Sequence, residues 1–190
     1  MKKNYLRKPM EMQLQSLPEN VRFCTRCVNS NQRPRIGFDE EGVCSACNYA
    51  DTKRTQIDWI ARKDELEETC DKYRRNDGWW DILVPGSGGK DSAFVAHLLK
   101  EEYGMNPLCV TWAPFQYTEI GRDNFHSFVD SGFTTITGYA NGTVHRKLAR
   151  LAFEEVGDNF LPFIWGQHSF VYHMALRYDI NLIFYGEHGE

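Results

Sequence analysis

The residues best suited to chemistry form a glycine-rich turn. Its sequence is Val84-Pro85-Gly86-Ser87-Gly88-Gly89-Lys90-Asp91-Ser92, placed after a short apolar run and before a helical pattern. Glycines let the backbone approach an anion closely, and free amides at the start of a helix point toward that anion. Ser87 and Ser92 could donate hydroxyls to phosphate oxygens. Lys90 would add positive charge, and Asp91 could hold Mg²⁺ or orient the turn. The segment predicts a phosphate-binding loop.

Two familiar phosphate-binding loops do not fit this segment. A Walker A loop needs Ser or Thr directly after Gly-Lys, and a Rossmann fingerprint needs a third glycine, but Asp91 stands at both positions. The order Ser-Gly-Gly-x-Asp-Ser resembles the signature of the PP-loop ATP pyrophosphatases. This resemblance implies that ATP is cleaved between its α- and β-phosphates, giving an adenylylated substrate and pyrophosphate. The alternative is a Gly-Ser turn that only caps a helix, with Asp91 and Ser92 in the first turn.

Four of the six cysteines form two C-x-x-C pairs, Cys24 with Cys27 and Cys44 with Cys47. Each pair puts two thiolates on one side of a tight turn, and two pairs can close a tetrahedral shell around Zn²⁺. Arg26 favours ionised thiolates in the first pair. Residues 38–42 predict a hairpin turn that joins the two pairs. The spacing predicts a structural zinc ribbon, with four unconnected cysteines or two disulfides as the alternatives.

Composition and charge narrow the class of protein. A length of 190 residues allows one ordinary domain with a small appendage. A net charge of −4, with both signs intermixed, argues against a general nucleic-acid binder. No apolar stretch follows the basic residues of 1–10, and none approaches the ~20 residues that cross a bilayer. We therefore expect a cytoplasmic protein without a membrane anchor, in which Cys70 and Cys109 are core residues rather than nucleophiles.

The elements that must position the glycine-rich turn alternate between strands and helices. We expect strands at 82–84, 108–112, 133–137 and 182–185, and helices at 57–74, 91–103, 121–130, 143–156 and 169–177. The alternation predicts an α/β fold, a doubly wound parallel sheet with helices on both faces. The chain stops soon after the expected fourth strand, so we expect the C-terminal end of this domain to be missing.

Four segments follow from this pattern. We expect a polar lead-in at 1–22, the zinc ribbon at 23–50, a connecting helix at 51–78 and an incomplete PP-loop ATP-binding domain at 79–190. Thr111 and Trp112 end the second strand and could border an adenine, although core packing is the alternative for Trp112. Glu187 ends the fourth strand at the carboxyl edge, where ligands of open α/β sheets bind. It could contact substrate or assist proton transfer, or it could only cap a helix or lie at the surface.

Read from Phe23 to Glu190, the chain resembles the N-acetyl sugar amidotransferase family of the PP-loop superfamily, whose fold is adenine nucleotide alpha hydrolase-like. The matching segments are 24–28 (CTRCV), 38–47 (FDEEGVCSAC), 57–59 (IDW), 86–92 (GSGGKDS), 120–124 (IGRDN), 145–150 (HRKLAR) and 184–187 (FYGE). Their order along the chain carries the resemblance. It implies a role in bacterial lipopolysaccharide, surface-polysaccharide or nonulosonic-acid biosynthesis.

The resemblance implies a reaction on a nucleotide-linked N-acetyl sugar. The acetyl carbonyl oxygen attacks the α-phosphate of ATP, and ammonia then replaces AMP to give an acetamidino group. The expected cofactors are ATP, Mg²⁺ and structural Zn²⁺. The chain has no glutaminase nucleophile motif, so the resemblance implies a separate glutaminase and a cyclase-like subunit that channels ammonia. The predicted ATP-binding residues are Gly86, Ser87, Gly88, Gly89, Lys90, Asp91, Ser92, Thr111 and Trp112, and the predicted catalytic residues are Lys90, Asp91 and Glu187.

Two rival functions remain open at this point. A tRNA-thiolating PP-loop enzyme can also carry a zinc module, but it needs reactive cysteines and a basic surface for tRNA. A nucleotide-binding scaffold could recruit partners through the zinc ribbon without catalysis. The sequence favours the sugar amidotransferase over both.

Overall fold

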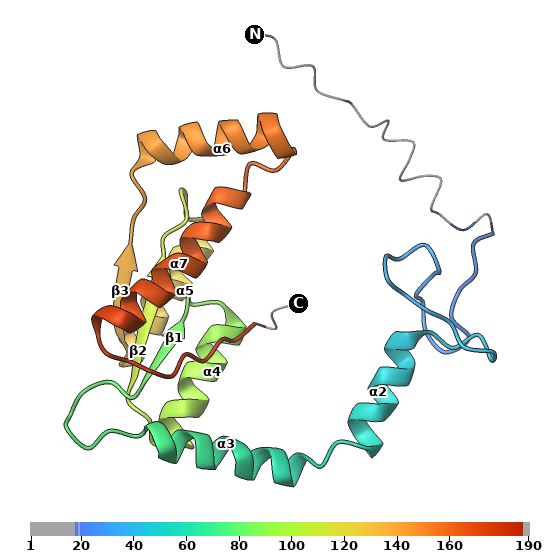
Figure 1. Cartoon of the computed structure of the whole chain (residues 1–190), viewed down its shortest axis with the longest axis horizontal. Coiled ribbons are helices and arrows are strands. Elements are labelled where there is room, and N and C mark those ends of the chain that lie inside the picture. The colour runs from blue at the N-terminus through green and yellow to red at the C-terminus, as the bar shows by residue number, and fades with distance from the viewer. Residues whose placement is uncertain (1–17, 19, 188–190) are drawn as a thin grey trace. The chain divides into compact units, whose positions relative to one another are not determined.

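The structure is a computed structural model that describes residue 18 and residues 20–187 (Figure 1). The chain divides into two compact units, Met1–Arg62 and Lys63–Glu190. Helix α3 (Trp59–Tyr73) begins in the first unit and ends in the second. Among the described residues, no helix combines the length and the apolar character that crossing a bilayer requires.

The first unit is built around the cysteine pairs. Isolated antiparallel bridges join Phe23 to Ser30 and Phe38 to Cys44, and the predicted hairpin turn at 38–42 is present. Helix α2 (Ser45–Thr55) begins inside the segment that we predicted as the ribbon, directly after Cys44. Val43 and the cysteines form the small core, against which Ile36 and Phe38 pack.

The second unit contains a parallel sheet of three strands in the order β1-β2-β3. The strands are β1 (Ile82–Pro85), β2 (Pro107–Trp112) and β3 (Thr134–Gly138). The helices that alternate with the strands or follow them are α4 (Lys90–Glu101), α5 (Glu119–Asp130), α6 (Gly142–Val156) and α7 (Leu161–Arg177). The expected α/β alternation is confirmed for these elements.

Both faces of the sheet are covered because neighbouring strand residues point to opposite sides. Ile82 and Val84 pack with residues of α4 and α5, including Leu99 and Phe128. Leu83 faces the other way and packs with residues of α7, including Val171. The carboxyl ends of β1 and β2 therefore lie between two helical layers, as the ribbon drawing also shows (Figure 1).

The prediction of a fourth strand at 182–185 is wrong, because this segment does not form a regular strand of the sheet. Its contact with the sheet is a single parallel bridge between Leu83 and Ile183. The Leu83 amide donates to the Leu182 carbonyl at 2.9 Å, and the Phe184 amide donates to the Leu83 carbonyl at 3.0 Å. These bonds use the edge of β1 that faces away from β2. The four residues are only half-buried, so the apolar run does not reach the burial expected of a central strand.

Helix α7 begins at Leu161, well before the start that we predicted at Ser169. Pro162 lies at the start of the helix, where a missing amide costs nothing. Gly166 lies within the helix and leaves room for Trp112: a Cβ at Gly166 would approach the indole Nε1 to 2.3 Å. This glycine permits close packing of α7 on the sheet and does not break the helix.

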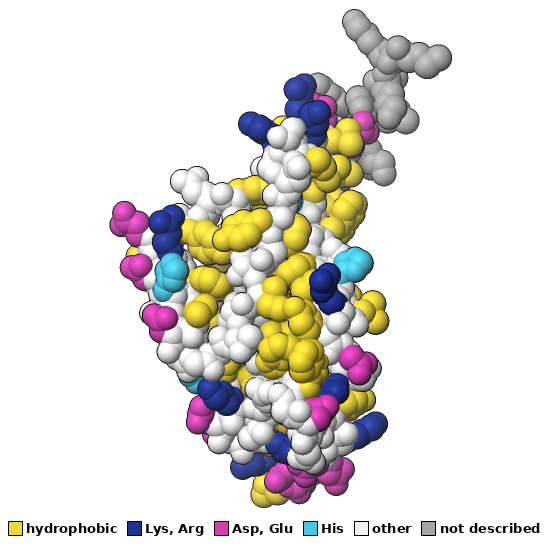
Figure 2. Space-filling model, turned by 90° about the vertical axis from the view of Figure 1, so that its left-hand side faces the viewer, with side chains coloured by type: hydrophobic (Ala, Val, Ile, Leu, Met, Phe, Trp, Pro, Cys, Tyr) yellow, Lys and Arg dark blue, Asp and Glu magenta, His cyan; other side chains and the backbone are white. Residues whose placement is uncertain are grey.

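Large apolar side chains remain exposed on α6 and α7. They include Val144, Leu148, Leu151, Phe153 and Val156 on α6, and Trp165, Tyr172 and Leu176 on α7. Figure 2 shows hydrophobic side chains gathered over the middle of one face of the molecule, with charged side chains mainly around them. Contiguous exposed apolar surface of this kind marks interaction sites in folded proteins.

Asp81 fixes the start of β1, and its replacement tests how this part of the sheet is held. The buried carboxylate accepts hydrogen bonds from the amides of Arg75 and Asn106. We expect Asp81→Ala to lower the free energy of unfolding by about 2–4 kcal/mol in urea titrations, because both amides lose their acceptor. Asp130→Ala, at an exposed position, should change it by less than about 0.5 kcal/mol. Equal stability of the two variants would contradict this role.

Candidate functional site

The glycine-rich turn connects β1 to α4 at the carboxyl edge of the sheet. The Gly86 amide donates to the Val110 carbonyl at 2.9 Å, and the Thr111 hydroxyl donates to the Gly86 carbonyl. Gly89 precedes α4 in an extended conformation, without a side-chain cap on the helix from any described residue. The amides of the first helical turn are therefore available to an anion.

Two glycines bring three stretches of backbone together around this turn. Gly88 has φ +82°, and a Cβ there would lie 2.8 Å from backbone atoms of Asn124 and Phe125 in α5. Gly186 follows the Ile183 bridge, and a Cβ there would lie 2.9 Å from backbone atoms of Asp91 and Ser92. Any side chain at either position would force these segments apart, so both glycines are required by the packing.

A cavity of about 540 Å³ opens beside this turn. We call it the glycine-loop cavity. Of the residues predicted from sequence, those that line it are Gly86, Ser87, Ser92, Thr111, Trp112 and Glu187. The structure thus brings together residues that are separated in sequence by about a hundred positions. They meet because the 182–187 segment returns to the free edge of β1, where the strand order reverses, which is where open α/β sheets bind ligands.

Four predicted residues, Gly88, Gly89, Lys90 and Asp91, are not among those that line the cavity. The Lys90 ammonium pairs with the Asp91 carboxylate at 2.7 Å, and both side chains are largely exposed. The Ser92 hydroxyl donates to the Gly89 carbonyl at 3.2 Å. The charged pair is therefore exposed in the first turn of α4 and does not line the cavity.

Sequence reasoning missed the wall that α7 contributes. Gln167, His168 and Tyr172 line the glycine-loop cavity from this helix, together with Tyr185. The apolar run after Pro162 was the available signal, because it extends the helix back to Leu161 and brings residues 167 and 168 to the sheet.

The Trp112 indole packs against α7 beside this cavity. Its Nε1 is buried, and none of the described residues accepts a hydrogen bond from it. The ring is held between Gly166 and Phe170, whose ring centroid lies 5.4 Å from that of Trp112. Buried donors nearly always have an acceptor in native proteins. The indole N–H lies against the α7 backbone at Gly166, so the donors that line the cavity itself are the hydroxyls of Ser87 and Ser92.

The second cluster with chemical potential is the set of four cysteines. Their sulfur atoms all lie within 4.8 Å of one another, with Cys24 and Cys47 at 4.0 Å and Cys27 and Cys44 at 3.6 Å. Four sulfurs at the vertices of a zinc tetrahedron are about 3.8 Å apart, given Zn–S bonds of about 2.3 Å. The four thiols could therefore hold a metal such as zinc, as predicted.

Backbone amides are directed at the sulfurs. Amides of Arg26 and Cys44 donate to the Cys24 sulfur at 3.3 and 3.2 Å. Burial opposes ionisation of Cys24, but these donors outweigh it and lower its pKa to about 6. Hydrogen bonding with Cys27 is the main cause that raises the pKa of Cys47, to about 12. Four thiolates this close cannot all ionise without a cation, which explains the opposite directions.

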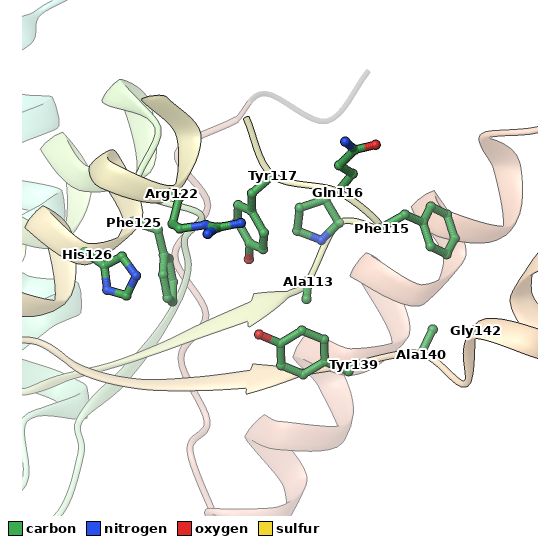
Figure 3. A pocket seen from close by; sticks show the side chains of 11 residues that line it. Ala113, Phe115, Gln116, Tyr117, Arg122, Phe125, His126, Tyr139, Ala140 and Gly142 are labelled. Atoms are coloured by element: carbon green, nitrogen blue, oxygen red, sulfur yellow. The ribbon is translucent and has the colours of Figure 1, made fainter. Parts of the chain in front are cut away.

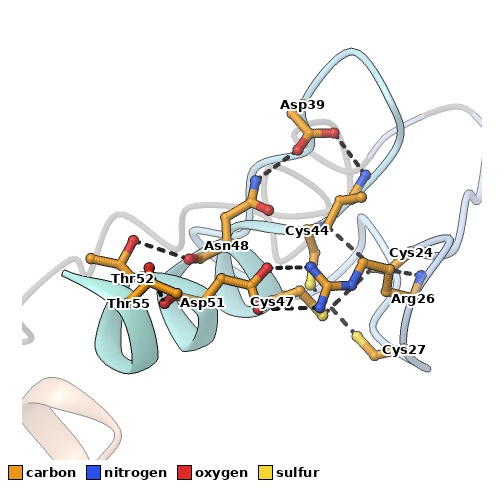
Figure 4. Close-up of polar contacts among 11 residues, drawn as sticks. Cys24, Arg26, Cys27, Asp39, Cys44, Cys47, Asn48, Asp51, Thr52 and Thr55 are labelled. Carbon is orange, nitrogen blue, oxygen red and sulfur yellow. Dashed lines mark hydrogen bonds and ion pairs between the residues drawn. The ribbon is translucent and has the colours of Figure 1, made fainter.

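Polar contacts tie the two cysteine pairs together (Figure 4). Arg26, between Cys24 and Cys27, forms a two-pronged ion pair with Asp51 of α2. Asp39 accepts from the Asn48 side chain at 2.7 Å and from the Val43 amide at 2.8 Å. These bonds lower the pKa of Asp39, the Asn48 contact most. The hairpin turn and α2 are thereby fixed around the sulfurs.

No family model matches this chain. A curated relative is an uncharacterized protein of Methanocaldococcus jannaschii, which is 30% identical over 88 residues. The aligned region covers 46% of this chain and 31% of that protein, so it spans about a third of the relative's length.

Metal analysis tests the cysteine cluster. We expect purified protein to carry roughly one zinc per chain, as measured by plasma mass spectrometry. Cys27→Ser should lose most of this zinc, because three thiolates and a hydroxyl bind it far more weakly. Cys70→Ala should retain it, because Cys70 is buried in the core of the other unit. Full zinc in Cys27→Ser would show that the four sulfurs are not the ligands.

Substitution of Gly88 tests the close packing of the turn. We expect Gly88→Ala to lower the free energy of unfolding by about 2 kcal/mol or more, because it adds strain at positive φ and a clash with α5. Gly142→Ala is the matched control, because a Cβ at that helical position meets nothing within 4 Å. Chemical denaturation of both variants measures the difference. A Gly88→Ala protein as stable as the control would disprove the constraint.

Proposed function

We propose that this chain binds ATP in the glycine-loop cavity and uses it to adenylylate an oxygen of a second substrate. The observation that carries this proposal is the cavity at the carboxyl edge of the sheet, where residues of the glycine-rich turn meet the ends of β2 and of the 182–187 segment. The residues concerned are Gly86, Ser87, Ser92, Thr111, Trp112 and Glu187. The Ser-Gly-Gly-x-Asp-Ser order supports the type of reaction, which is that of the PP-loop ATP pyrophosphatases.

Each residue of the turn takes a role in this proposal. Amides at the start of α4 and the hydroxyls of Ser87 and Ser92 bind phosphate oxygens. Lys90 leaves its ion pair with Asp91 to neutralise the phosphate chain, and the freed Asp91 carboxylate is a ligand for the Mg²⁺ that accompanies ATP. Thr111 and Trp112, which line the cavity, border the adenosine.

The second substrate in this proposal is a nucleotide-linked N-acetyl sugar. Its acetyl carbonyl oxygen attacks the α-phosphorus of ATP, and the bond to pyrophosphate breaks. Ammonia then adds to the activated carbon, AMP departs with the former acetyl oxygen, and loss of a proton leaves an acetamidino group. An amide carbon resists ammonia until its oxygen becomes a leaving group, which explains the use of ATP. In this proposal Glu187, which lines the cavity, accepts the proton.

Ammonia comes from a separate glutaminase in this proposal, delivered through a cyclase-like partner. Among the described residues, the two cysteines outside the four-cysteine cluster are buried in the core, so neither is a glutaminase nucleophile. The exposed apolar side chains of α6 and α7 provide surface on which such a partner could dock. The proposed setting is cytoplasmic synthesis of a surface glycan.

The tRNA-thiolation alternative is weaker on structural grounds. It needs a reactive thiol in the α/β unit, but Cys109 is buried in β2, and burial raises its pKa to about 12. Cys70 is equally buried, and its pKa is also raised by burial. The net charge of −4 gives no general attraction for tRNA.

Isotope transfer tests the proposed reaction. With a UDP-linked N-acetyl sugar whose acetyl oxygen is labelled, ATP and ammonium, we expect the label to appear in AMP and a nitrogen to replace it in the sugar, both detected by mass spectrometry. Asp91→Ala should reduce AMP formation by about 10²–10³-fold. Asp130→Ala, the control, should form AMP at the wild-type rate.

Two outcomes would reject the proposal in different ways. ATP binding without pyrophosphate exchange or AMP, in folded protein with any N-acetyl sugar nucleotide, would favour a nucleotide-binding scaffold. AMP formation in which the acetyl oxygen stays on the sugar would keep adenylylation but reject the carbonyl as its acceptor.

A further inference from the structure

A second cavity of about 540 Å³ lies at the same edge of the sheet, beyond the ends of β2 and β3 and beside the start of α5 (Figure 3). Aromatic side chains dominate its wall: Phe115, Tyr117, Phe125 and Tyr139. Arg122 and His126 of α5 also line it, and none of the described residues contributes a carboxylate to it. We call it the aromatic cavity. Its volume falls within the range of about 300–1,000 Å³ that small-molecule sites occupy.

The polar groups of this cavity favour an anion. Arg122 is exposed and forms no ion pair with a carboxylate anywhere in the described part of the chain. The Tyr117 hydroxyl is buried, without a hydrogen-bond partner among residues 20–187. Burial raises the pKa of Tyr117, which keeps this hydroxyl a neutral donor. A guanidinium, a hydroxyl donor and several rings without carboxylates suit a ligand with aromatic and phosphate parts.

The two cavities flank the glycine-rich turn. Residues 110–112 line the glycine-loop cavity, and the chain continues directly into Ala113 and Pro114, which line the aromatic cavity. Phe125 lines the aromatic cavity with its side chain, while its backbone meets Gly88 of the turn. The aromatic cavity is therefore on the α5 side of the glycine-rich turn. The glycine-loop cavity, in which we propose that ATP binds, is on the α7 side of the same turn.

We propose that the aromatic cavity binds the nucleoside diphosphate part of the second substrate. The base stacks on the rings of Tyr139 and Phe125, and Arg122 binds a phosphate. This assignment rests on the proposed function, which places ATP in the other cavity. It explains why a sugar attached to the diphosphate would reach the turn at which the α-phosphate of ATP is bound.

Calorimetry with UDP, GDP and CDP as probes tests this site without requiring any reaction. We expect at least one of these to bind the wild type. Tyr139→Ala should weaken that binding roughly tenfold, because stacking on one ring is lost. Arg122→Gln should weaken it roughly tenfold or more, because a charge-assisted contact is lost. Both side chains are exposed, so neither substitution should disturb the fold.

Matched variants and ATP titrations complete the test. Arg146→Gln on α6 and Tyr49→Ala in the cysteine unit remove an exposed cation and an exposed ring elsewhere, and both should bind the probe as the wild type does. Tyr139→Ala and Arg122→Gln should also bind ATP with unchanged affinity. Unchanged affinity for the diphosphate in both variants, or absence of binding by all three probes, overturns the proposal. So does a parallel loss of ATP binding, which would place the adenosine of ATP in this cavity.

The outcome separates this inference from the proposed function. Diphosphate binding that depends on Tyr139 and Arg122, in a protein that makes no AMP from sugar nucleotides, supports the cavity and rejects only the reaction. If the acetyl oxygen is transferred to AMP but diphosphate binding does not depend on Tyr139 or Arg122, the reaction is supported and only the assignment of the cavity is rejected.

Discussion

Three stretches of backbone meet at the carboxyl edge of the sheet with no space between them for a side chain. Gly88 lies against the backbone of α5, and Gly186 lies against the first turn of α4. Ser87, Ser92 and Glu187 line one cavity because these contacts are so short. The candidate site thus depends on the absence of two Cβ atoms more than on any attractive contact.

Strand β2 links the site to the rest of the α/β unit. Its interior residues are buried between two helical layers, and its last residues form walls of the glycine-loop cavity. The Thr111 hydroxyl bonds to the Gly86 carbonyl, so the end of β2 also holds the turn that follows β1. The cysteine unit is organised separately, by amides directed at sulfur and by the contact of Arg26 with Asp51. The two units obtain their order from different interactions, one from apolar packing and the other from polar contacts around four sulfur atoms.

Much of this architecture could be predicted from sequence, because local signals specify it. The glycine-rich turn, the spacing of Cys24, Cys27, Cys44 and Cys47, and the three strands all follow from short patterns that the structure retains. The early start of α7 was missed although the apolar run after Pro162 indicates it, because a glycine within a helix resembles a break until its neighbour Trp112 is known. The prediction of a strand at 182–185 was wrong for a related reason. Four apolar residues indicate a strand, but only the partners across the sheet decide how many hydrogen bonds form.

The segment that carries Gly186 and Glu187 is held to the sheet by two backbone hydrogen bonds at Leu83, whereas β2 is paired on both sides. Amides of 182–186 should therefore exchange their hydrogens with solvent sooner than those of β2. One wall of the glycine-loop cavity is thus the least protected part of the sheet edge. Occupancy of the cavity would slow exchange there first, so the protein carries its own reporter of ligand binding in a few peptide bonds beside Glu187.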